Sequence, residues 1–411
     1  MIIKGKNIFI DHGFTAGAVE FDDKITGIYD SESAAGFGTD LSAAQRAGEI
    51  IDAGEDYVIP GFVDIHTHGG AGGDFSDGSI EGNRIAAAHY AAHGVTSFLA
   101  TTMTIPEVEI IDAVTAIKQY KDEADKARDI AFADAQMRGL AEARCMGVHL
   151  EGPFLSKAKK GAQAESALHS PDAALWHRFN DASGNIVRMV TVAPEEPGGI
   201  EFVKEVSKYC AVSVGHTACD YETAMAAYEA GASHATHLFN GMPSLHHRNP
   251  GPIAAAMDSG ASAELICDGL HINPAIIRLT YKLFGDKLNL ISDSLRCAGL
   301  PDGDYELGGQ PIHLSGGVAR LKGTDTLAGS AITVHDAVKN VVRFGLPLEA
   351  AIYAATAAPA LAAGIAGEKS DDGGKDATAG VGIFAPGNYA DILILDKNLD
   401  IKAVYIGGKR L

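Results

Sequence analysis

The sequence predicts an α/β protein: a (β/α)8 barrel of the TIM type with a small β-sandwich domain formed by the two termini. Eight short apolar runs alternate with longer helical patterns between residues 60 and 293, as parallel strands with helical crossovers require. Runs with β patterning occupy both ends of the chain. Several of the eight central runs end in residues that suit metal binding or catalysis, and barrel active sites lie at such strand ends.

The two ends of the chain are expected to pair with one another. Short β-type runs separated by Gly, Ser and Asp occupy residues 1–59. Patterning of the same kind returns after residue 380, with turns at Pro386-Gly387 and Gly407-Gly408. The Ala- and Gly-rich stretch 34–48 is expected to be a surface loop or a short helix. We therefore assign residues 1–59 together with 372–411 to one small β domain.

The catalytic barrel is expected to span residues 60–371. Its strands are predicted at 62–66, 96–101, 146–151, 187–193, 211–216, 234–238, 264–268 and 289–293. Helical patterns lie between most of them, at 80–93, 107–128, 221–229 and 274–284, and two more, at 333–343 and 348–363, are expected to complete the outer ring. The Gly- and Asp-rich segment 364–380 is expected to be a flexible loop that joins the two modules.

Composition narrows the partners of this chain. Its 411 residues are 46% hydrophobic, which suits one large α/β domain and a smaller one. Asp and Glu number 53 against 33 Lys and Arg, and the resulting formal net charge of -20 repels nucleic acid. A small anionic ligand is compatible with this charge, because a few local Arg, Lys and His residues can bind one phosphate.

Cysteine usage and hydropathy indicate the compartment. The five cysteines are an odd number without a C-x-x-C spacing, so we expect reduced thiols in the core. Lysines alternate with apolar residues at the N-terminus, unlike in a signal peptide, and no run of about 18 apolar residues occurs. We expect a soluble cytoplasmic protein with no membrane partner.

The stretch 57–70 ends an apolar run with two histidines, His66 and His68. Residues i and i+2 of a strand point to the same face, so both imidazoles can aim at one point beyond the strand end. An H-x-H pair is by itself a weak signal, since two ordinary polar residues leaving a strand would look the same. The ends of the other predicted strands strengthen the metal-binding interpretation.

Further ligand-type residues end other predicted strands and are expected to converge in a barrel. A single such residue could simply cap the next helix, but the set favours a functional site. Two histidines and one carboxylate suit a divalent ion that activates water, most often Zn²⁺, and Glu151, His216 and His237 supply that set. His66 and His68, with Asp293, could hold a second ion bridged through Glu151. Asp293 is also the natural general base.

A series of motifs resembles the N-acetylglucosamine-6-phosphate deacetylases, a family within the amidohydrolase superfamily. The motifs are PGFVDIHTH at 60–68, EGPFL at 151–155, GHT at 215–217, THLFNGMP at 236–243, CDGLH at 267–271, SD at 292–293, TLAGS at 326–330 and GIFAPGNYAD at 382–391. The resemblance implies hydrolysis of the acetyl amide of N-acetyl-D-glucosamine 6-phosphate to D-glucosamine 6-phosphate and acetate, in amino-sugar catabolism or cell-wall recycling. It also implies one or two divalent ions and a homodimer whose phosphate site is completed across the interface.

Carried over by position, the resemblance assigns a role to each matching residue. It places the main metal site on Glu151, His216 and His237, and the catalytic acid/base on Asp293. Substrate contacts fall on Asn240, Gly241, Arg248, His271, Leu327, Ala328 and Gly329, and on Gln163, where the family usually carries a histidine. Arg248 suits a terminal phosphate because a guanidinium binds two oxygens at once, although an exposed loop arginine can also be merely solvated.

Other functions stay open on the sequence alone. A cyclic-amide hydrolase of the dihydroorotase type would share the barrel and the H-x-H pair, but it would usually place a carboxylated lysine where Glu151 stands. A relative acting on another N-acyl amino sugar fits the same motifs, and Gln163 could alter the substrate range. A non-catalytic sugar-phosphate-binding protein would be expected to have lost a metal ligand or Asp293, and the chain keeps them all.

Overall fold

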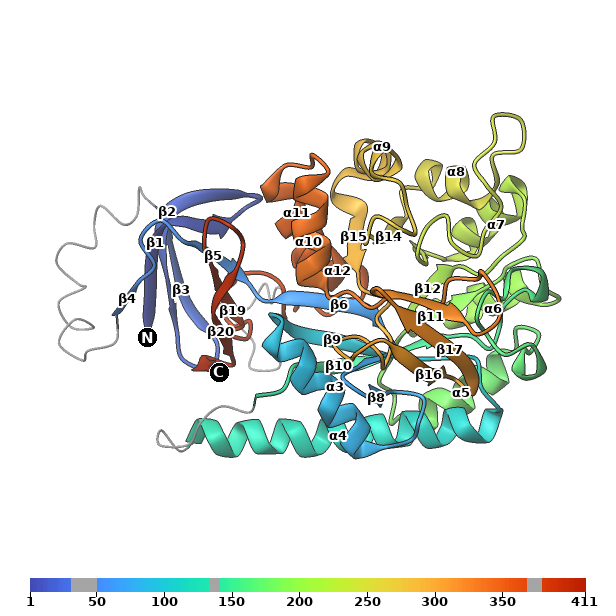
Figure 1. Cartoon of the computed structure of the whole chain (residues 1–411), viewed down its shortest axis with the longest axis horizontal. Helices are drawn as coiled ribbons and strands as arrows, with labels where there is room; N and C mark the ends of the chain where they lie inside the picture. The colour runs from blue at the N-terminus through green and yellow to red at the C-terminus, as the bar shows by residue number, and fades with distance from the viewer. Residues whose placement is uncertain (31–49, 134–140, 368–378) are drawn as a thin grey trace.

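The structure is a computed structural model that describes residues 1–30, 50–133, 141–367 and 379–411 (Figure 1). The stretch 34–48, the boundary expected between residues 371 and 372, and most of the loop expected at 364–380 lie outside the described residues. A sheet built from both termini lies at one end of the molecule, and the barrel with its helices forms the rest (Figure 1).

The barrel contains the eight predicted strands, which pair in parallel in chain order. They are β6 (Phe62–Thr67), β9 (Val95–Thr102), β10 (Arg144–Glu151), β11 (Val187–Val192), β12 (Ala211–Val214), β13 (His234–Ala235), β14 (Ser262–Ile266) and β15 (Leu288–Ile291). The first and last strands meet at a seam, where the Asp293 amide donates to the His66 carbonyl at 2.9 Å and the His68 amide donates to the Ser294 carbonyl at 2.8 Å. The predicted fold class is confirmed.

Five strands end earlier than the sequence predicts, and after three of them the chain turns at a predicted site residue. The predicted strands continue through His216, His237 and Asp293, whereas β12, β13 and β15 stop before them. These residues have left-handed backbones, with φ of 47°, 25° and 49°. A left-handed residue cannot continue a strand, so the chain turns there and aims the side chain over the end of the barrel.

Each helix that the sequence predicts is present, and the described chain has further helices at 173–182, 199–206 and 251–258 that the sequence analysis does not include. The helices are α3 (Ile80–Ala92), α4 (Glu107–Ala133), α5 (Ala173–Ala182), α6 (Gly199–Val206), α7 (Tyr221–Ala230), α8 (Gly251–Asp258), α9 (Pro274–Phe284), α10 (Val334–Arg343), α11 (Leu348–Ala355) and α12 (Ala357–Ala362). Polar caps start several of them: Asp220 accepts from the Thr223 amide, and Thr333 forms a capping box with Asp336. The single helical segment expected at 348–363 is two helices, because the ring of Pro359 would clash with a carbonyl of a continuous helix.

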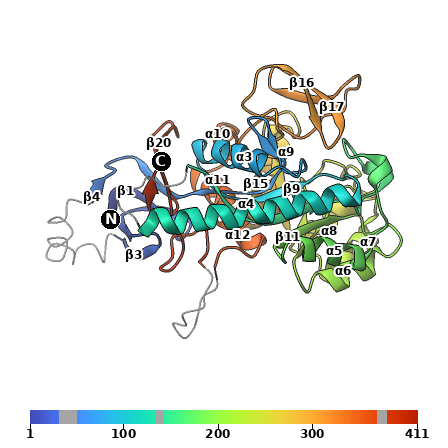
Figure 2. The ribbon, with the colours of Figure 1, turned by 90° about the horizontal axis from the view of Figure 1, so that it is seen from below.

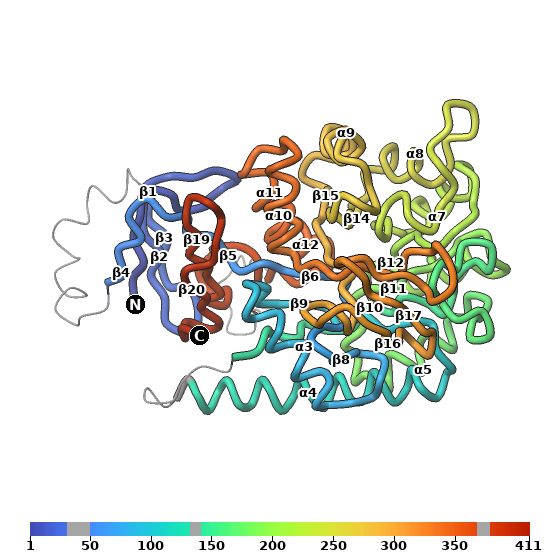
Figure 3. The backbone as a smooth tube through the Cα atoms, in the orientation of Figure 1, coloured from blue at the N-terminus to red at the C-terminus, as the bar shows by residue number. Residues whose placement is uncertain are grey.

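The terminal segments form one continuous sheet, with the order β21-β20-β19-β5-β1-β2-β3 and β4 paired to β1. Its strands are β1 (Ile2–Ile10), β2 (Gly13–Phe21), β3 (Ile25–Asp30), β4 (Ile50–Asp52), β5 (Tyr57–Pro60), β19 (Ile392–Leu395), β20 (Ile401–Ile406) and β21 (Lys409–Arg410). Antiparallel pairing of β5 with β19 joins the two ends of the chain, as predicted, and Figure 3 shows the blue and red segments side by side. The expected sandwich is thus a single hydrogen-bonded sheet of eight strands.

An antiparallel three-stranded sheet, which the sequence analysis does not include, lies between the eighth barrel strand and α10. Its strands are β16 (Gly303–Leu307), β17 (Gln310–Ser315) and β18 (Val318–Leu321). Both turns are Gly-Gly pairs with positive φ, at Gly308-Gly309 and Gly316-Gly317, the backbone that two-residue hairpins need. Figure 2 shows β16 and β17 projecting from the barrel. A two-residue ribbon, β7 (Gly69–Gly70) with β8 (Gly73–Asp74), follows β6.

The helix α4 is the longest in the described chain, and it runs along the barrel toward the terminal sheet in both views (Figures 1 and 2). Arg128, near its C-terminal end, donates to the carbonyls of Glu142 and Ala143 at 3.1 and 2.9 Å. None of the described helices is both long enough and apolar enough to span a membrane.

Candidate metal centre and active site

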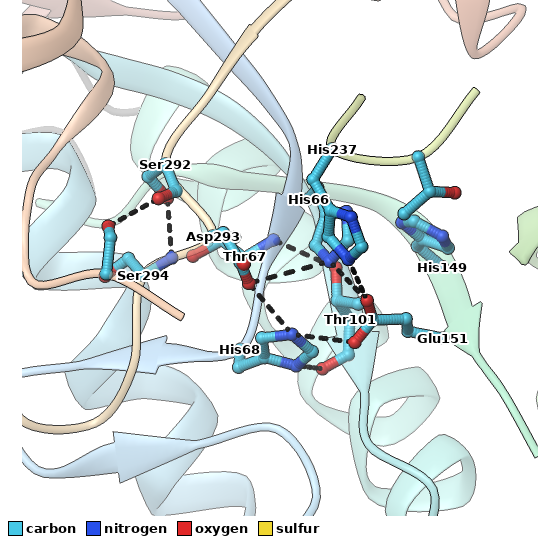
Figure 4. A network of polar contacts seen from close by, with 12 residues as sticks. His66, Thr67, His68, Thr101, His149, Glu151, His237, Ser292, Asp293 and Ser294 are labelled. Atoms are coloured by element: carbon cyan, nitrogen blue, oxygen red, sulfur yellow. Dashed lines mark hydrogen bonds and ion pairs between the residues drawn. The ribbon is translucent and has the colours of Figure 1, made fainter. Parts of the chain in front are cut away.

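The carboxyl end of the barrel gathers all six predicted metal-binding and catalytic residues. They are His66, His68, Glu151, His216, His237 and Asp293, and all are buried. Figure 4 shows His66, His68, Glu151, His237 and Asp293 turned toward one another. The left-handed backbones at three of these positions are uncommon for residues with a side chain, and such conformations cluster at functional sites.

Three donor atoms of the predicted main metal site lie close together. Glu151 Oε1 is 2.9 Å from His237 Nε2 and 3.1 Å from His216 Nε2, and these two nitrogens are 3.1 Å apart. Donors at about 2.0–2.1 Å from a tetrahedral Zn²⁺ are roughly 3.3 Å from one another, so the set fits a divalent ion. His216 Nδ1 lies 2.8 Å from the Lys159 carbonyl, which can only accept, so in the neutral imidazole the proton is on Nδ1 and Nε2 is available as a ligand.

A second cluster lies on the other side of Glu151. His68 Nε2 is 3.2 Å from both Glu151 Oε2 and Asp293 Oδ1, and His66 Nε2 is 3.4 Å from Glu151 Oε1 and 3.7 Å from Asp293 Oδ1. The buried His66 Nε2 has no hydrogen-bond partner among the described residues. Since Glu151 Oε2 faces His68, and Oε1 faces both His66 and the main set, these residues suit a second ion bridged through Glu151.

The six predicted metal-binding and catalytic residues, called the rim below, create an electrostatic field that favours positive charge. Burial lowers the pKa of His68, but hydrogen bonds to Asp293 and Glu151 raise it to about 9 overall. Burial raises the pKa of Asp293, but the hydrogen bond from His68 and the charges of His66 and His68 outweigh burial and hold this pKa below its usual value. Two ionised carboxylates among four imidazoles create the field that a divalent cation requires.

Glu264 is a buried residue of the site that the sequence analysis missed. Its Oε2 accepts from His66 Nδ1 at 2.9 Å and from the His237 amide at 3.0 Å, and its Oε1 lies 3.1 Å from His234 Nε2. Burial alone would raise the pKa of Glu264, but the charge of His66 and the hydrogen bond from His234 hold it well below the usual range. Glu264 therefore orients one residue of each ion cluster.

His149 belongs to the same inner layer, and its Nε2 lies 2.8 Å from Thr191 Oγ1. Burial and the neighbouring charge of His66 lower the pKa of His149 to about 3. The sequence did contain a signal for this layer, because His149, His234 and Glu264 are ionisable residues inside predicted barrel strands. Such residues are rarely buried unless they are paired.

A pocket opens above the six rim residues. Six of the predicted substrate-contact residues line it, namely Gln163, Asn240, Gly241, His271, Leu327 and Gly329, and Leu307 of β16 contributes to its wall. Ala328 is buried beside them. Gly329 has a φ of 43°, and a Cβ at this position would lie 2.7 Å from the Asp293 carbonyl, so the loop approaches the rim as closely as it does only with glycine here.

Two predicted substrate contacts, Arg248 and Gln163, differ from the other residues of the pocket. Arg248 is exposed on the loop between α7 and α8 and is not among the residues that line the pocket. Gln163 lines the pocket but is only 2% exposed, and its side-chain amide is bonded to Thr104 and Glu151. The structure thus brings five of the six predicted metal-binding and catalytic residues, and most of the predicted substrate contacts, into one pocket of a single subunit, without His66 and Arg248.

Known proteins resemble this chain over most of its length. The amidohydrolase family matches residues 57–411. An N-acetylglucosamine-6-phosphate deacetylase from Bacillus subtilis is 36% identical over 299 residues, which are 72% of each chain. An N-acetylgalactosamine-6-phosphate deacetylase from Escherichia coli O157:H7 is 32% identical over 372 residues, which are 90% of this chain and 89% of the other.

The fold matches a solved member of this group. The structure of an N-acetyl-D-glucosamine-6-phosphate deacetylase mutant from Mycobacterium smegmatis, in complex with N-acetyl-D-glucosamine 6-phosphate, superposes with a TM-score of 0.83 and 31% identity. The match covers 100% of this chain and 98% of that one. By its matched residues and its fold, the chain belongs to the amidohydrolase family.

Proposed function

We propose that the protein is a metal-dependent hydrolase that removes the acetyl group from N-acetyl-D-glucosamine 6-phosphate, giving D-glucosamine 6-phosphate and acetate. The observation that carries this proposal is the two-histidine, one-carboxylate set beside Asp293, at the base of one pocket. The relatives of the chain, which are named as deacetylases of 6-phosphorylated N-acetylhexosamines, support the substrate class.

Glu151, His216 and His237 would hold the main ion, which we propose to be Zn²⁺, and His66, His68 and Asp293 would hold a second. A divalent ion bound there supplies a Lewis acid that polarises the amide carbonyl and eases the ionisation of the attacking water. The buried donor atoms lie too close together to be left without a cation or protons between them, which supports this assignment.

Asp293 would carry the proton of the reaction. Its carboxylate, ionised because its pKa is held low, accepts a proton from the attacking water at Oδ1, while the water oxygen bonds to the amide carbon. Asp293 then delivers this proton to the sugar nitrogen as the C–N bond breaks, so that amine and acetate leave.

The remaining lining residues would bind the sugar. His271 Nδ1 is held by Asp268 Oδ2 at 2.7 Å, which leaves its Nε2 for a polar contact with the substrate. Asn240, Gly241 and the loop 327–329 would form the opposite wall.

Phosphate recognition would involve a second copy of the chain. Arg248 stands on an exposed loop together with Leu245, whose side chain is 46% exposed, and Leu270, 56% exposed, lies in the following loop. Exposed leucines beside a cationic side chain suit a subunit interface, so we propose a homodimer in which Arg248 serves the partner's pocket. The free cysteines of the described chain support a cytoplasmic location.

N-acetylgalactosamine 6-phosphate is a second candidate substrate, because the relative named for it aligns with 90% of this chain. The two sugars differ only in the configuration of one hydroxyl, and the pocket residues could bind either epimer.

Purified protein tests both candidates. Release of free amine and acetate is measured from each 6-phosphorylated sugar, from unphosphorylated N-acetylglucosamine and from dihydroorotate, and bound metal is measured by atomic emission. We expect turnover of N-acetylglucosamine 6-phosphate with at least about one tightly bound divalent ion per chain. Faster turnover of N-acetylgalactosamine 6-phosphate would make that sugar the first candidate substrate. Turnover of dihydroorotate alone, or full activity without metal, would overturn the proposed function.

A further inference from the structure

Gln163 is a pocket-lining residue whose polar atoms are both used inside the protein. It follows the short helix η1 (Lys157–Lys159). Its Oε1 accepts from the Thr104 amide at 2.7 Å, and its Nε2 donates to Glu151 Oε2 at 2.6 Å. With 2% of its surface exposed, the side chain has little area left for a ligand.

The chemistry of the two partners fixes the orientation of this amide. A backbone N–H can only donate and an ionised carboxylate can only accept, so exchanging the amide oxygen and nitrogen would break both bonds. Thr104 also contacts Glu151 directly, because the Thr104 hydroxyl donates to the Glu151 carbonyl at 3.3 Å. Thr104 therefore holds Glu151 twice, once at the backbone and once through Gln163.

The bond from Gln163 decides how Glu151 presents its carboxylate. Oε1 faces His216 and His237 and lies 3.4 Å from His66 Nε2, while Oε2 takes the Gln163 bond and lies 3.2 Å from His68 Nε2. The terminal torsion of a glutamate is soft, so without a donor on Oε2 both oxygens could turn toward one ion cluster. The fixed Gln163 amide on Oε2 keeps this oxygen beside His68 and leaves Oε1 directed toward His216 and His237.

We propose that Gln163 is a positioning residue that fixes the Glu151 carboxylate between the two ion clusters, and that it acts on catalysis through Glu151 instead of through the substrate. The catalytic part of this inference rests on the proposed function, whereas the effect on metal affinity does not. Partners of this kind behind a metal ligand typically change metal affinity or activity by roughly 10- to 100-fold.

The test compares Gln163→Met, which keeps the length but loses both hydrogen bonds, with Gln163→Ala and Gln163→His. The dissociation constant of Zn²⁺ is measured by competition with a chromophoric chelator, after the full-length protein has been stripped of metal. We expect roughly 10- to 100-fold weaker Zn²⁺ binding in both the Met and the Ala variant. Gln163→His should restore part of the affinity, because a neutral imidazole has one donor and one acceptor.

Kinetics separate positioning from substrate contact. In the Met and Ala variants kcat should fall by about 10-fold or more while KM changes little. Asn240→Ala is the matched control, because Asn240 is another amide of the same pocket whose Nδ2 bonds the backbone carbonyl of His237, at 3.2 Å, and not a metal-binding side chain. We expect it to raise KM without weakening Zn²⁺ binding.

Unchanged Zn²⁺ affinity in the Gln163→Met and Gln163→Ala variants, with a raised KM, would overturn the inference and make Gln163 a substrate contact. A wild-type protein that deacetylates neither sugar phosphate, combined with weaker Zn²⁺ binding in the variants, would instead overturn the proposed function and leave the positioning role intact.

Discussion

The rim of the barrel and the terminal sheet bury opposite kinds of residue. The core of the terminal sheet is apolar, with Ile3, Val19, Phe21 and Ile392 almost fully enclosed. The charged residues of this sheet pair at the surface, as in the ion pair of Lys6 with Glu55. Such exposed pairs contribute little to stability, so apolar burial is the main stabilising interaction here.

The rim buries carboxylates and imidazoles in place of apolar side chains, and three of its residues have left-handed backbones. Each of these features costs free energy, and each persists only because the surrounding structure holds it. Left-handed residues also occur in the terminal sheet, at Asp11, His12 and Leu399, but they lie in the connections between its strands, so the difference lies in the cluster of ionisable side chains buried at the rim. Variants in the two regions should therefore change different measurements.

The largest effect is expected at the rim, from Asp293→Asn. This change keeps the shape of the side chain but removes the proton acceptor, so kcat should fall by roughly 10²- to 10⁴-fold with little change in KM. Steady-state kinetics with N-acetylglucosamine 6-phosphate measure both constants. Asp391→Asn is the matched control, because Asp391 is a buried aspartate beside the terminal sheet that accepts from the Gly407 amide at 2.8 Å. A similar loss of kcat in both variants would remove the distinction between the two regions.

In the terminal sheet the expected effect is on stability alone. Ile392→Ala removes a fully buried side chain from β19 and should lower the free energy of unfolding by about 2–5 kcal/mol, because it leaves a cavity. Chemical denaturation measures this loss. The kcat of the folded variant should match that of the wild type, and a large fall in kcat would show that the sheet also shapes the active site.

Much of the rim could be predicted because its residues lie at or just beyond the ends of apolar runs. His66, Glu151 and Asp293 were placed by the position of their strands and by the rule that active sites of barrels lie at the carboxyl ends of strands. The pairing of the two termini was predicted from β patterning alone, and the β5–β19 ladder confirms it.

The contacts behind the rim could not be predicted in the same way. His66 meets Glu264 across 198 positions of sequence, and Gln163 meets Thr104 across 59, so each pair depends on how the barrel closes. The β16–β18 sheet was different, since its two Gly-Gly turns between alternating runs are a readable hairpin signal. Sequence patterning thus finds elements, while partners brought together by closure of the barrel need coordinates.

Arg248→Ala tests whether the Arg248 side chain binds the phosphate of the substrate. Loss of a charge-assisted contact with phosphate, present in both ground and transition states, should raise KM by about 10- to 100-fold with a small change in kcat. The preference for N-acetylglucosamine 6-phosphate over N-acetylglucosamine should shrink by a similar factor. Retention of full discrimination would place phosphate recognition elsewhere.

Mixing the two impaired proteins, assayed at a substrate concentration near the wild-type KM, shows which subunit Arg248 serves. A mixed dimer of Arg248→Ala and Asp293→Asn chains has one pocket with both residues intact only if Arg248 reaches the partner. Activity above the sum of the two separate variants is therefore expected after subunit exchange. No gain in exchanged dimers would assign Arg248 to its own pocket.

The smallest expected effect is a loss of stability at acid pH, caused by protonation of a histidine near the rim. His89, on α3, is half-buried against the loops that carry Gly70 and Gly299, and its Nε2 has no hydrogen-bond partner among the described residues. Burial, with a smaller contribution from the charge of His93, lowers the pKa of His89 from 6.5 to about 4. The folded state therefore binds fewer protons than the unfolded state between these values, so the stability that His89 contributes is complete above pH 6.5 and is lost as the pH falls toward 4.

A His89→Gln variant, which cannot take up the proton, should lose about 1 kcal/mol less than the wild type over this range, the half-exposed ring reducing the effect. Thermal unfolding followed across the same pH range measures the difference, and any offset above pH 6.5 reports packing alone. Ile392→Ala should instead lower the whole profile without changing its slope, because no titrating group is involved. Parallel profiles for His89→Gln and the wild type would show that acid sensitivity does not arise beside the rim.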